Sequence, residues 1–426
     1  DISTLILSVK NNNNYDIIFQ GKTITNRVIY MELYNYQTKT WDVVSSQVNN
    51  DNDVITLGYN YEKSKNNYLL DNEILVRISS NNYVTKPAID TYIYHVTDVQ
   101  YISRNGSLDV ASVANNAKKA LKEMSDHLIE QFNNDLLEYV VMTGDFVQST
   151  VVTGEIEWPI VMDNLINPLL EQNIPLGVVS GNHDVGALRE NSDNGSDALD
   201  DELVYDLFYE HLGEQVFKDK PYYGGSYLNN RSHYDLITIN NHEFLFLYLG
   251  WGSSIKGIHV SEQDINYAKT ILEQYPNKTV VLALHEYMSN KENKSRTGLY
   301  VFEQLVKPYS NIKIVLSGHI NGSSANIDLI DDNNDGIIDR KVFQLLTNFQ
   351  EEAIDNLGAS FMRRIGLDFT NDKLHLDLFS PVTNDHQIFV NNNASYVDKY
   401  TQFTYDFNLN NHEYGLLTLQ FGKASD

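Results

Sequence analysis

The feature that most constrains the fold is a change of pattern near residue 88, from short strands alone to alternating strands and helices. In the first part, runs rich in β-branched and aromatic residues are separated by clusters of Asn, Asp, Gly and Lys. The strand-like runs are Leu5–Val9, Asp16–Phe19, Arg27–Leu33, Trp41–Ser45, Val54–Leu57 and Ile74–Ser79. Roughly six or seven short strands at this spacing predict an immunoglobulin- or fibronectin-like β-sandwich over residues 1–88. It gathers no catalytic residue types, so we interpret it as a packing or attachment module.

From residue 89 onward, strand-like runs alternate with segments of helical periodicity. The predicted strands are Thr91–Val96, Tyr139–Met142, Leu176–Val179, His233–Ile239, Phe244–Leu249, Val280–Leu284, Ile314–Leu316 and Val342–Leu346. The predicted helices are 108–134, 156–171 with a break at Pro168, and a helix through Leu272 that a Ser261–Asp264 capping box opens. This alternation predicts a layered α/β domain over residues 89–426, which includes the strand-like runs of the C-terminal tail.

The charge balance disfavours two classes of partner. Acidic residues outnumber basic ones 57 to 31, which gives a formal net charge of −26. A nucleic-acid-binding protein needs a basic footprint, and so does a protein that docks on anionic lipid. A phosphate-bearing substrate can still bind where metal ions reverse the local field. We therefore expect no nucleic acid among the partners.

The composition also bears on compartment and chemistry. The chain contains no cysteine, which excludes disulfide bonds, cysteine nucleophiles and thiolate metal sites. No apolar run approaches 18 residues, so we expect no transmembrane segment. The chain begins at Asp1 without Met or a signal-peptide pattern, and we expect a trimmed or mature form. These features favour a secreted or cell-surface protein, with a cytoplasmic enzyme as the alternative.

Five polar segments follow directly on predicted buried strands of the second part. They are Thr97–Gln100, Gly144–Asp145, Gly181–Asp184, His285 and Gly318–Asn321. In α/β sheets the loops beyond the carboxyl ends of the strands converge on one crevice, so residues far apart in sequence meet there. Any one segment is a weak signal, because a Gly-Asp pair is usually a turn and a lone His is usually structural. All five segments together, each at the end of such a strand, are a strong signal.

The five segments offer carboxylate, carboxamide and imidazole groups and no sulfur. This set suits borderline or hard divalent ions such as Mn, Fe, Zn or Mg. One carboxylate that reaches two ions would hold them about 3.5–4 Å apart, the spacing used for in-line phosphoryl displacement. The segments therefore predict a metal centre.

The same segments resemble the motifs of a known family. Here they read D-x-Q, GD, GNHD, H and GHIN, and the pattern of the calcineurin-like metallophosphoesterases is D-x-H, GD, GNH-D/E, H and GHxH. The resemblance spans about residues 91–380 and is similar to bacterial members with a D-x-Q first motif. It implies a four-layer αββα double β-sandwich with a dinuclear centre at the strand ends. A preceding β-sandwich also occurs in relatives such as the purple acid phosphatases.

By position, the resemblance implies a ligand set for each ion, one bridging residue and one acid. The first ion would be held by Asp98, Gln100 and Asn321, the second by Asn182, His285 and His319, and Asp145 would bridge them. His183 would protonate the leaving oxygen or stabilise the transferring phosphoryl group. The cofactors would be two divalent ions, with Mn, Fe or Zn favoured.

Three residues depart from the family pattern. Gln100 replaces a common His, and Asn321 replaces the last His, so the first site loses its imidazoles and becomes a harder site that is weaker for zinc. Gln148 stands three residues after Asp145, where relatives carry an Asp that orients the catalytic His, or a Tyr in the purple enzymes. Without that Asp, His183 lacks a partner that would fix its tautomer. Without that Tyr, no iron–tyrosinate centre is expected.

A second candidate ion site lies in the acidic segment 331–339. Positions one, three, five and nine of an EF-hand-like loop are taken by Asp331, Asn333, Asp335 and Asp339. Gly336 stands at position six, but Val342 replaces the usual Glu at position twelve, and strands rather than helices are predicted on both sides. A structural calcium site and a plain acidic turn are the two interpretations.

We interpret the chain as a metal-dependent phosphoester hydrolase, in which a metal-activated hydroxide attacks a phosphate mono- or diester in line. One alternative is a catalytically weak surface or binding protein on a phosphoesterase scaffold, with Asn321 and Gln148 marking a weakened centre. Hydrolysis through a single tightly bound ion is another. Metal content and turnover of aryl phosphates would separate these interpretations.

Overall fold

The structure, a computed structural model, shows two compact units, each with its own sheets and apolar core. It describes residues 3–8, 15–22, 27–38, 40–49, 54–61, 66–70, 73–82, 89–186, 199–252, 257–333, 339–350, 360–370, 372–384, 403–406 and 418–423. Residues 1–87, 403–405 and 412–426 form one unit, and residues 88–402 with 406–411 form the other. No helix within the described ranges is both long and apolar enough to cross a membrane.

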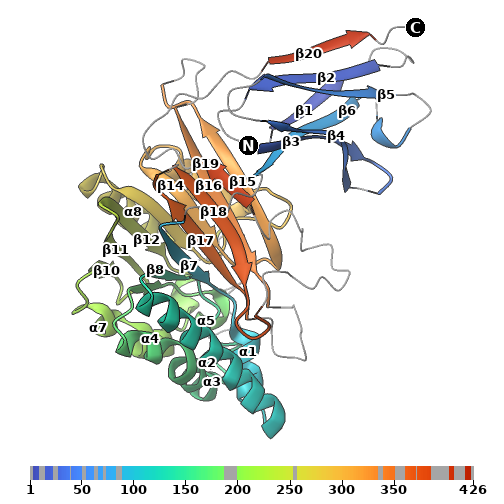
Figure 1. The fold of residues 1–426 in the computed structure, drawn as a ribbon. Helices are drawn as coiled ribbons and strands as arrows, with labels where there is room; N and C mark the ends of the chain where they lie inside the picture. The colour runs from blue at the N-terminus through green and yellow to red at the C-terminus, as the bar shows by residue number, and fades with distance from the viewer. Residues whose placement is uncertain are drawn as a thin grey trace. The chain divides into compact units, whose positions relative to one another are not determined.

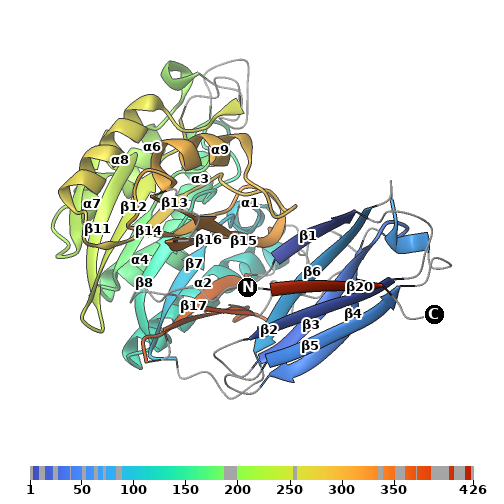
Figure 2. The same ribbon diagram turned by 90° about the horizontal axis from the view of Figure 1, so that it is seen from above.

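The first unit is a sandwich of two antiparallel sheets (Figures 1 and 2). One sheet has the order β1 (Ser3–Ser8), β6 (Glu73–Asn82), β3 (Arg27–Asn35) and β4 (Thr40–Asn49), and the other β20 (Thr418–Lys423), β2 (Tyr15–Lys22) and β5 (Val54–Tyr61). The short η1 (Asn66–Tyr68) lies between β5 and β6. Side chains of both sheets meet in one apolar cluster, in which Phe19 of β2 lies with Met31 and Leu33 of β3. The predicted all-β first region is therefore confirmed.

The C-terminal strand β20 belongs to this first unit. It pairs antiparallel with β2, from Lys423 opposite Tyr15 to Thr418 opposite Gln20. This pairing covers the edge of β2 that β5 does not occupy. The predicted second domain ran from residue 89 to 426, so the structure differs from the prediction at this end. The strand pattern of the tail does not itself reveal which sheet the strand joins.

The second unit contains two mixed sheets. One has the order β18 (Lys373–Phe379), β17 (Met362–Asp368), β7 (Thr91–Val96), β8 (Leu137–Met142) and β9 (Leu176–Val178). The short strand β19 is Phe403–Asp406. The other has the order β10 (Tyr223–Tyr227), β11 (Ser232–Ile239), β12 (His242–Leu249), β13 (Thr279–Leu284), β14 (Ile312–Ser317), β16 (Arg340–Asn348) and β15 (Gly322–Ile330). The strands β7, β8 and β9 are parallel, and so are β12, β13, β14 and β16. Their carboxyl ends carry the five polar segments.

Helices cover the outer face of each sheet, as Figures 1 and 2 show. Over β7–β9 lie α1 (Gln100–Gly106), α2 (Ala111–Asn133), α3 (Gly154–Val161), η2 (Met162–Ile166), α4 (Asn167–Glu171) and α6 (Asp206–Leu212). The short α7 (Glu214–Phe217) lies against β10. Over β12–β14 lie α8 (Glu262–Gln274), α9 (Arg296–Val301) and η5 (Phe302–Val306). The remaining helices are α5 (Asn182–Val185) and η3 (Asp200–Glu202).

The two sheets pack against each other through their inner faces. The ring of Tyr139 on β8 stacks on that of Phe246 on β12, with 4.0 Å between ring centroids. The Tyr248 hydroxyl of β12 donates a 3.0 Å hydrogen bond to the Tyr139 hydroxyl, which in turn donates to the buried carboxylate of Asp235. Helix, sheet, sheet and helix therefore form the four layers that the sequence predicts.

The predicted helix over residues 156–171 is divided in the structure into α3, a π-helical turn (η2) and α4. Pro159 lies inside α3 and donates no backbone N–H, which disturbs the hydrogen-bond ladder there. Pro168 stands just after the π-helical turn and also lacks a backbone N–H, so a second hydrogen bond of the ladder is missing there. The capping box opens α8 as predicted, since the Ser261 side chain accepts a 3.1 Å hydrogen bond from the Asp264 N–H.

Replacing Gly177 by Ala should destabilise the second unit. A Cβ on this β9 residue would fall against the hydroxyl of Tyr139 and the ring of Tyr248, which the inter-sheet network holds in place. We expect a loss of about 1–3 kcal/mol in its free energy of unfolding, measured by denaturant or thermal unfolding. Gly58→Ala is the control, because a Cβ there meets no atom within 4 Å. Equal stability of the two variants would contradict this description of the packing.

Candidate metal centre

Three predicted ligands lie together where the two sheets present the carboxyl ends of their parallel strands. Asp145 follows β8, His285 follows β13 and His319 follows β14. One ligand atom from each residue lies within 4.8 Å of the other two. His285 Nε2 is 3.3 Å from Asp145 Oδ2. Strands of both sheets therefore contribute to one buried cluster.

Asn182, the first residue of α5 after β9, joins this cluster through its side-chain oxygen. Its Oδ1 is 3.2 Å from His285 Nε2 and 2.9 Å from His319 Nδ1. The other ring nitrogen of His285, Nδ1, is 2.6 Å from the carbonyl oxygen of Thr143. A backbone carbonyl accepts only, so Nδ1 carries the proton of a neutral His285 ring and Nε2 faces the cluster as an acceptor.

Asp98, after β7, is held on the other side of the cluster by several donors. The Thr97 hydroxyl donates to its Oδ2 over 2.6 Å, and the His319 N–H donates to the same oxygen over 3.1 Å. The side-chain amide of Asn348, the last residue of β16, donates to Oδ1 over 2.8 Å. The carboxylate is buried and its position is fixed by neighbouring strand ends.

A chain of carboxamides links the remaining predicted ligands. Gln100 Nε2 donates to Asp145 Oδ2 over 3.1 Å and also to Gln350 Oε1. Gln350 Nε2 in turn donates to Asn321 Oδ1 over 3.0 Å. The structure thus connects Asn321 to the cluster through Gln350, a residue to which the sequence interpretation gave no role.

Backbone strain occurs at three of the predicted ligands. Asp98, Asp145 and His319 have φ values of 55°, 56° and 67°, in the left-handed region that non-glycine residues seldom adopt. Gly144, with φ of 92°, allows close approach of the turn before Asp145 to the backbone of Gly181. Such outliers persist where the surrounding structure enforces them, and they cluster at functional sites.

One carboxylate, that of Asp184, joins the turns after β8 and β9. Its Oδ2 accepts from the N–H groups of Asp145 (2.7 Å) and Gly181 (2.8 Å), and its Oδ1 accepts from those of Phe146 (2.7 Å) and Val147 (3.2 Å). These four backbone donors would otherwise be buried without partners. Asp184 therefore fixes the position of Asp145 relative to α5.

His183 points its side chain to the loop after Asp145 rather than into the ligand cluster. Its backbone N–H donates to Asp145 Oδ1 over 3.0 Å, and its Nδ1 is 2.6 Å from the carbonyl oxygen of Gln148. A carbonyl accepts only, so Nδ1 carries a proton and Nε2 is left for a substrate atom. A backbone carbonyl thus fixes the tautomer that the sequence suggested would lack a partner.

A second imidazole with a carboxylate partner lies beside the cluster. His259 Nδ1 is 2.5 Å from Glu286 Oε2, and Thr297 Oγ1 donates to the same oxygen over 2.8 Å. The His259 ring stacks on Trp251, whose ring also lies near those of His285 and His319. No sequence pattern pairs His259 with Glu286, which lies 27 residues further along the chain.

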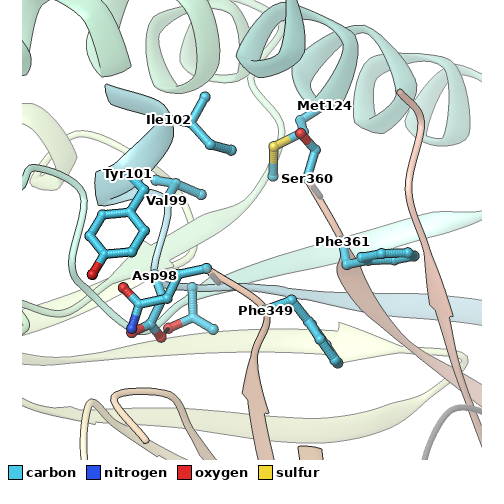
Figure 3. Close-up of a pocket in the computed structure, with 10 residues that line it drawn as sticks. Asp98, Val99, Tyr101, Ile102, Met124, Phe349, Ser360 and Phe361 are labelled. Atoms are coloured by element: carbon cyan, nitrogen blue, oxygen red, sulfur yellow. Dashed lines mark hydrogen bonds between the residues drawn. The ribbon is translucent and has the colours of Figure 1, made fainter. Parts of the chain in front are cut away.

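A small hollow opens beside Asp98 (Figure 3). Its wall is formed by the apolar side chains of Val99, Ile102, Met124, Phe349 and Phe361, together with Tyr101 and Ser360. The first predicted metal site therefore faces an apolar wall.

The acidic segment 331–339 lies between β15 and β16, flanked by strands as predicted, and its residues 331–333 and 339 are described. Asp339 Oδ2 accepts hydrogen bonds from the N–H groups of Asp332 (2.7 Å) and Asn333 (3.4 Å), as expected of an acidic turn. Asp335 and Gly336 lie outside the described residues. The calcium interpretation, with Asp331 as its first ligand, stays a prediction.

Comparison with known proteins identifies the family. Residues 91–322 match the family model described as calcineurin-like phosphoesterase. The chain belongs to this family. It is also 31% identical over 385 residues to the "Uncharacterized protein YvnB" of Bacillus subtilis (strain 168), a match that covers 89% of this chain and 26% of the relative. The chain therefore spans about a quarter of the length of that curated relative.

Solved structures to which the chain is similar include a dimetal phosphatase from Danio rerio and the protein TT1561 of Thermus thermophilus. The first is 10% identical, with a TM-score of 0.42, and the alignment covers 69% of this chain and 97% of that one. The second is also 10% identical, with a TM-score of 0.32 and coverage of 70% and 97%.

Members of the calcineurin-like phosphoesterase family use divalent metal ions, and the residues of this chain fit them. Gln100 Oε1 is buried and has no hydrogen-bond partner among the described residues, which is unusual for a buried polar atom. A cation bound between Gln100 and Asp145 would satisfy it. The cluster offers oxygen and imidazole nitrogen donors, as borderline and hard ions prefer.

Electrostatics in this phosphoesterase centre follow from burial and from close contacts. Burial raises the pKa of Asp98 to about 7. Burial alone would raise the pKa of Asp145, but the imidazoles of His285 and His183 hold it well below its usual range. Burial would lower the pKa of His285, but the carboxylate of Asp145 raises it to about 10. Burial beside His285 lowers the pKa of His319 to about 4.

Metal binding to the metal-free protein should release protons. At pH 8 the His285 ring, with its pKa of about 10, holds a proton that a metal ion must displace. The affinity for the ion at His285 should fall about tenfold per unit as the pH is lowered from 9 to 7, since each ion displaces one proton. Below about pH 7, Asp98 is protonated too, and the affinity of the first site for its ion should also fall.

The measurement is calorimetric titration of the metal-free chain with Mn²⁺ in buffers of different ionisation enthalpy, which gives the number of protons released. His242→Asn is the control, because His242 stacks on Phe369 at the opposite end of β12. Binding without proton release at pH 8 would contradict the placement of the ion at His285.

The Asp184→Asn variant should lose both stability and metal. An amide in place of the carboxylate points N–H groups at backbone N–H donors, so at least one donor loses its acceptor. We expect the second unit to lose about 1–3 kcal/mol in its free energy of unfolding and to bind metal more weakly. Asp126→Asn, on the exposed face of α2, should change neither. Wild-type stability of Asp184→Asn would show that Asp184 does not hold the two turns.

Proposed function

We propose that this chain hydrolyses phosphate esters at a centre that holds two divalent metal ions. The observation that carries the proposal is the convergence of Asp98, Asp145, His285 and His319 from four strand ends of two sheets into one buried cluster. A cluster with this donor set and an unpartnered buried oxygen at Gln100 is suited to cations rather than to a structural hydrogen-bond network alone.

The proposal assigns each ion its own ligands and one bridging residue. Asp145, with carboxylate contacts to both Gln100 and His285, lies where a bridging ligand belongs. Asn182, His285 and His319 would hold one ion, and Asp98 and Gln100 the other. When bound, such ions offset the charge of the phosphate group and allow a water molecule to attack at neutral pH.

His183 is proposed to assist the departure of the alcohol. Its Nδ1 is engaged by the Gln148 carbonyl, so Nε2 would carry the transferable proton towards the leaving oxygen. Its backbone N–H bonds to Asp145, which places the ring close to the cluster without making it a ligand. The His259 ring, held by Glu286 and Trp251, provides a second polar group near His319 that could contact the substrate.

The proposal is tested by metal analysis and turnover together. Protein purified without chelator should contain more than one equivalent of divalent metal and should hydrolyse aryl phosphates. Metal-free protein without turnover, even after Mn²⁺, Fe²⁺ and Zn²⁺ are added back, would favour the alternative of a binding protein on a phosphoesterase scaffold. One tightly bound equivalent with full activity would favour hydrolysis through a single ion.

The His183→Ala variant should lose activity while keeping its metal. A general acid typically contributes about 10²–10⁴-fold to the rate, so kcat should fall by a factor in this range. The loss should be smaller for a nitrophenyl ester, whose leaving oxygen hardly needs a proton, and larger for an alkyl phosphate. Equal losses on both substrates would leave His183 as an electrostatic clamp. Loss of metal with the activity would mean that His183 is a ligand or a structural support.

A further inference from the structure

The first ion of the proposed centre has no imidazole among its predicted ligands Asp98, Gln100 and Asn321. The structure places a third carboxamide, that of Gln350, beside those of Gln100 and Asn321. We propose, on the basis of the proposed function, that Gln350 supplies an oxygen ligand to this ion. Asn321, which holds the position of the family's last ligand, then acts on Gln350 as a positioning residue. The first site would consist of oxygen donors alone, from Asp98, Gln100, Asp145 and Gln350.

The orientation of the Gln350 amide supports this role. Its Nε2 donates to Asn321 Oδ1 over 3.0 Å, so Oε1 is turned the other way, to the Nε2 group of Gln100. Asn321 is itself held in place, because its backbone carbonyl accepts a 3.0 Å hydrogen bond from the side chain of Asn290. One lone pair of Asn321 Oδ1 is thus used within the protein, and Gln350 Oε1 is the oxygen that faces the cluster.

The Gln100 amide marks the place of the cation. Its Nε2 group lies between two oxygens, Asp145 Oδ2 and Gln350 Oε1, while its own Oε1 is buried without a partner among the residues that the structure describes. The terminal amide of Gln turns about a broad, roughly two-fold torsion. A half-turn would bring a third oxygen to the same point, an arrangement that only a cation stabilises.

Gln350 is also held ready by its own strand. It follows β16, which is parallel to β14, so its side chain emerges at the same edge as Asp98 and His319. The Gln350 N–H donates a 3.0 Å hydrogen bond to Asn348 Oδ1, and the amide of Asn348 donates to Asp98. Gln350 and Asp98 line the same hollow beside the site. Backbone and side chain are thus fixed relative to a ligand carboxylate before any ion binds.

An all-oxygen set has a consequence for the choice of metal. Hard ions such as Mg²⁺, Mn²⁺ and Ca²⁺ prefer carboxylate and carbonyl oxygens, whereas zinc gains from imidazole. The first site should therefore prefer Mn²⁺ over Zn²⁺ relative to the second site, where His285 and His319 supply nitrogen. Two different ions in one centre follow from this asymmetry.

The experiment is a titration of the metal-free full chain with Mn²⁺, read out as bound ions per chain by electron paramagnetic resonance and calorimetry. The wild type should bind two ions with distinct affinities. Gln350→Ala should lower the affinity for the looser ion by more than about 100-fold and leave the affinity for the tighter ion unchanged. Asn321→Ala should lower the affinity for the looser ion less, by about 10–100-fold, as the loss of a residue that bonds to a ligand does. Gln350→Glu should tighten it, because a charged oxygen replaces a neutral one.

Gln304→Ala is the matched control, because the side chain of Gln304 bonds to Lys269 away from the centre. This variant should bind both ions as the wild type does. Gln350→Glu preserves the size of the side chain and keeps the test valid if the Ala variant folds poorly by circular dichroism. Wild-type binding of both ions by Gln350→Ala would overturn the proposal. The proposal would also be overturned if Asn321→Ala lost more affinity for the looser ion than Gln350→Ala does, or if the wild type bound a single ion.

Turnover of an aryl phosphate, measured on the same samples, separates this inference from the proposed function. Two ions that respond to Gln350 as expected, with no turnover, would support the ligand assignment and contradict the hydrolase. Turnover, together with first-ion affinity that is unchanged in the Gln350 variants, would support the hydrolase and contradict the ligand assignment.

Discussion

The arrangement of the centre depends on a carboxylate that never needs to touch an ion, that of Asp184. Four backbone N–H groups from the turns after β8 and β9 converge on its two oxygens. Those turns carry Asp145 and His183. The sheets bring the strand ends to one edge, and the hydrogen bonds of Asp184 fix how the turns that carry Asp145 and His183 lie relative to each other.

Parallel pairing explains why so much of the site was predictable from the sequence. Each buried strand that runs in the same direction ends at the same edge, so polar residues placed just after such strands must meet. That rule, applied to Asp98, Asp145, Asn182, His285 and His319, predicted residues that the structure brings into one cluster. Long apolar runs and the Ser261 cap likewise have local causes, and the corresponding strands and α8 are found where they were expected.

What could not be predicted depends on pairing partners and on side-chain orientation. The same rule covers β16, whose end carries Asn348 and Gln350, but a lone strand does not reveal that it lies parallel to β14. The pairing of His259 with Glu286 requires two distant loops to be placed side by side. The pairing of β20 with β2 is a long-range contact of the same kind. In each case the missing information is which segments are neighbours in space.

The left-handed backbone at Asp98, Asp145 and His319 bears on the stability of the fold. A glycine at any of these positions would adopt the same conformation without the penalty, of order 1 kcal/mol each, that a side chain incurs. The side chains at these three positions therefore cost the fold stability that glycine would not cost it.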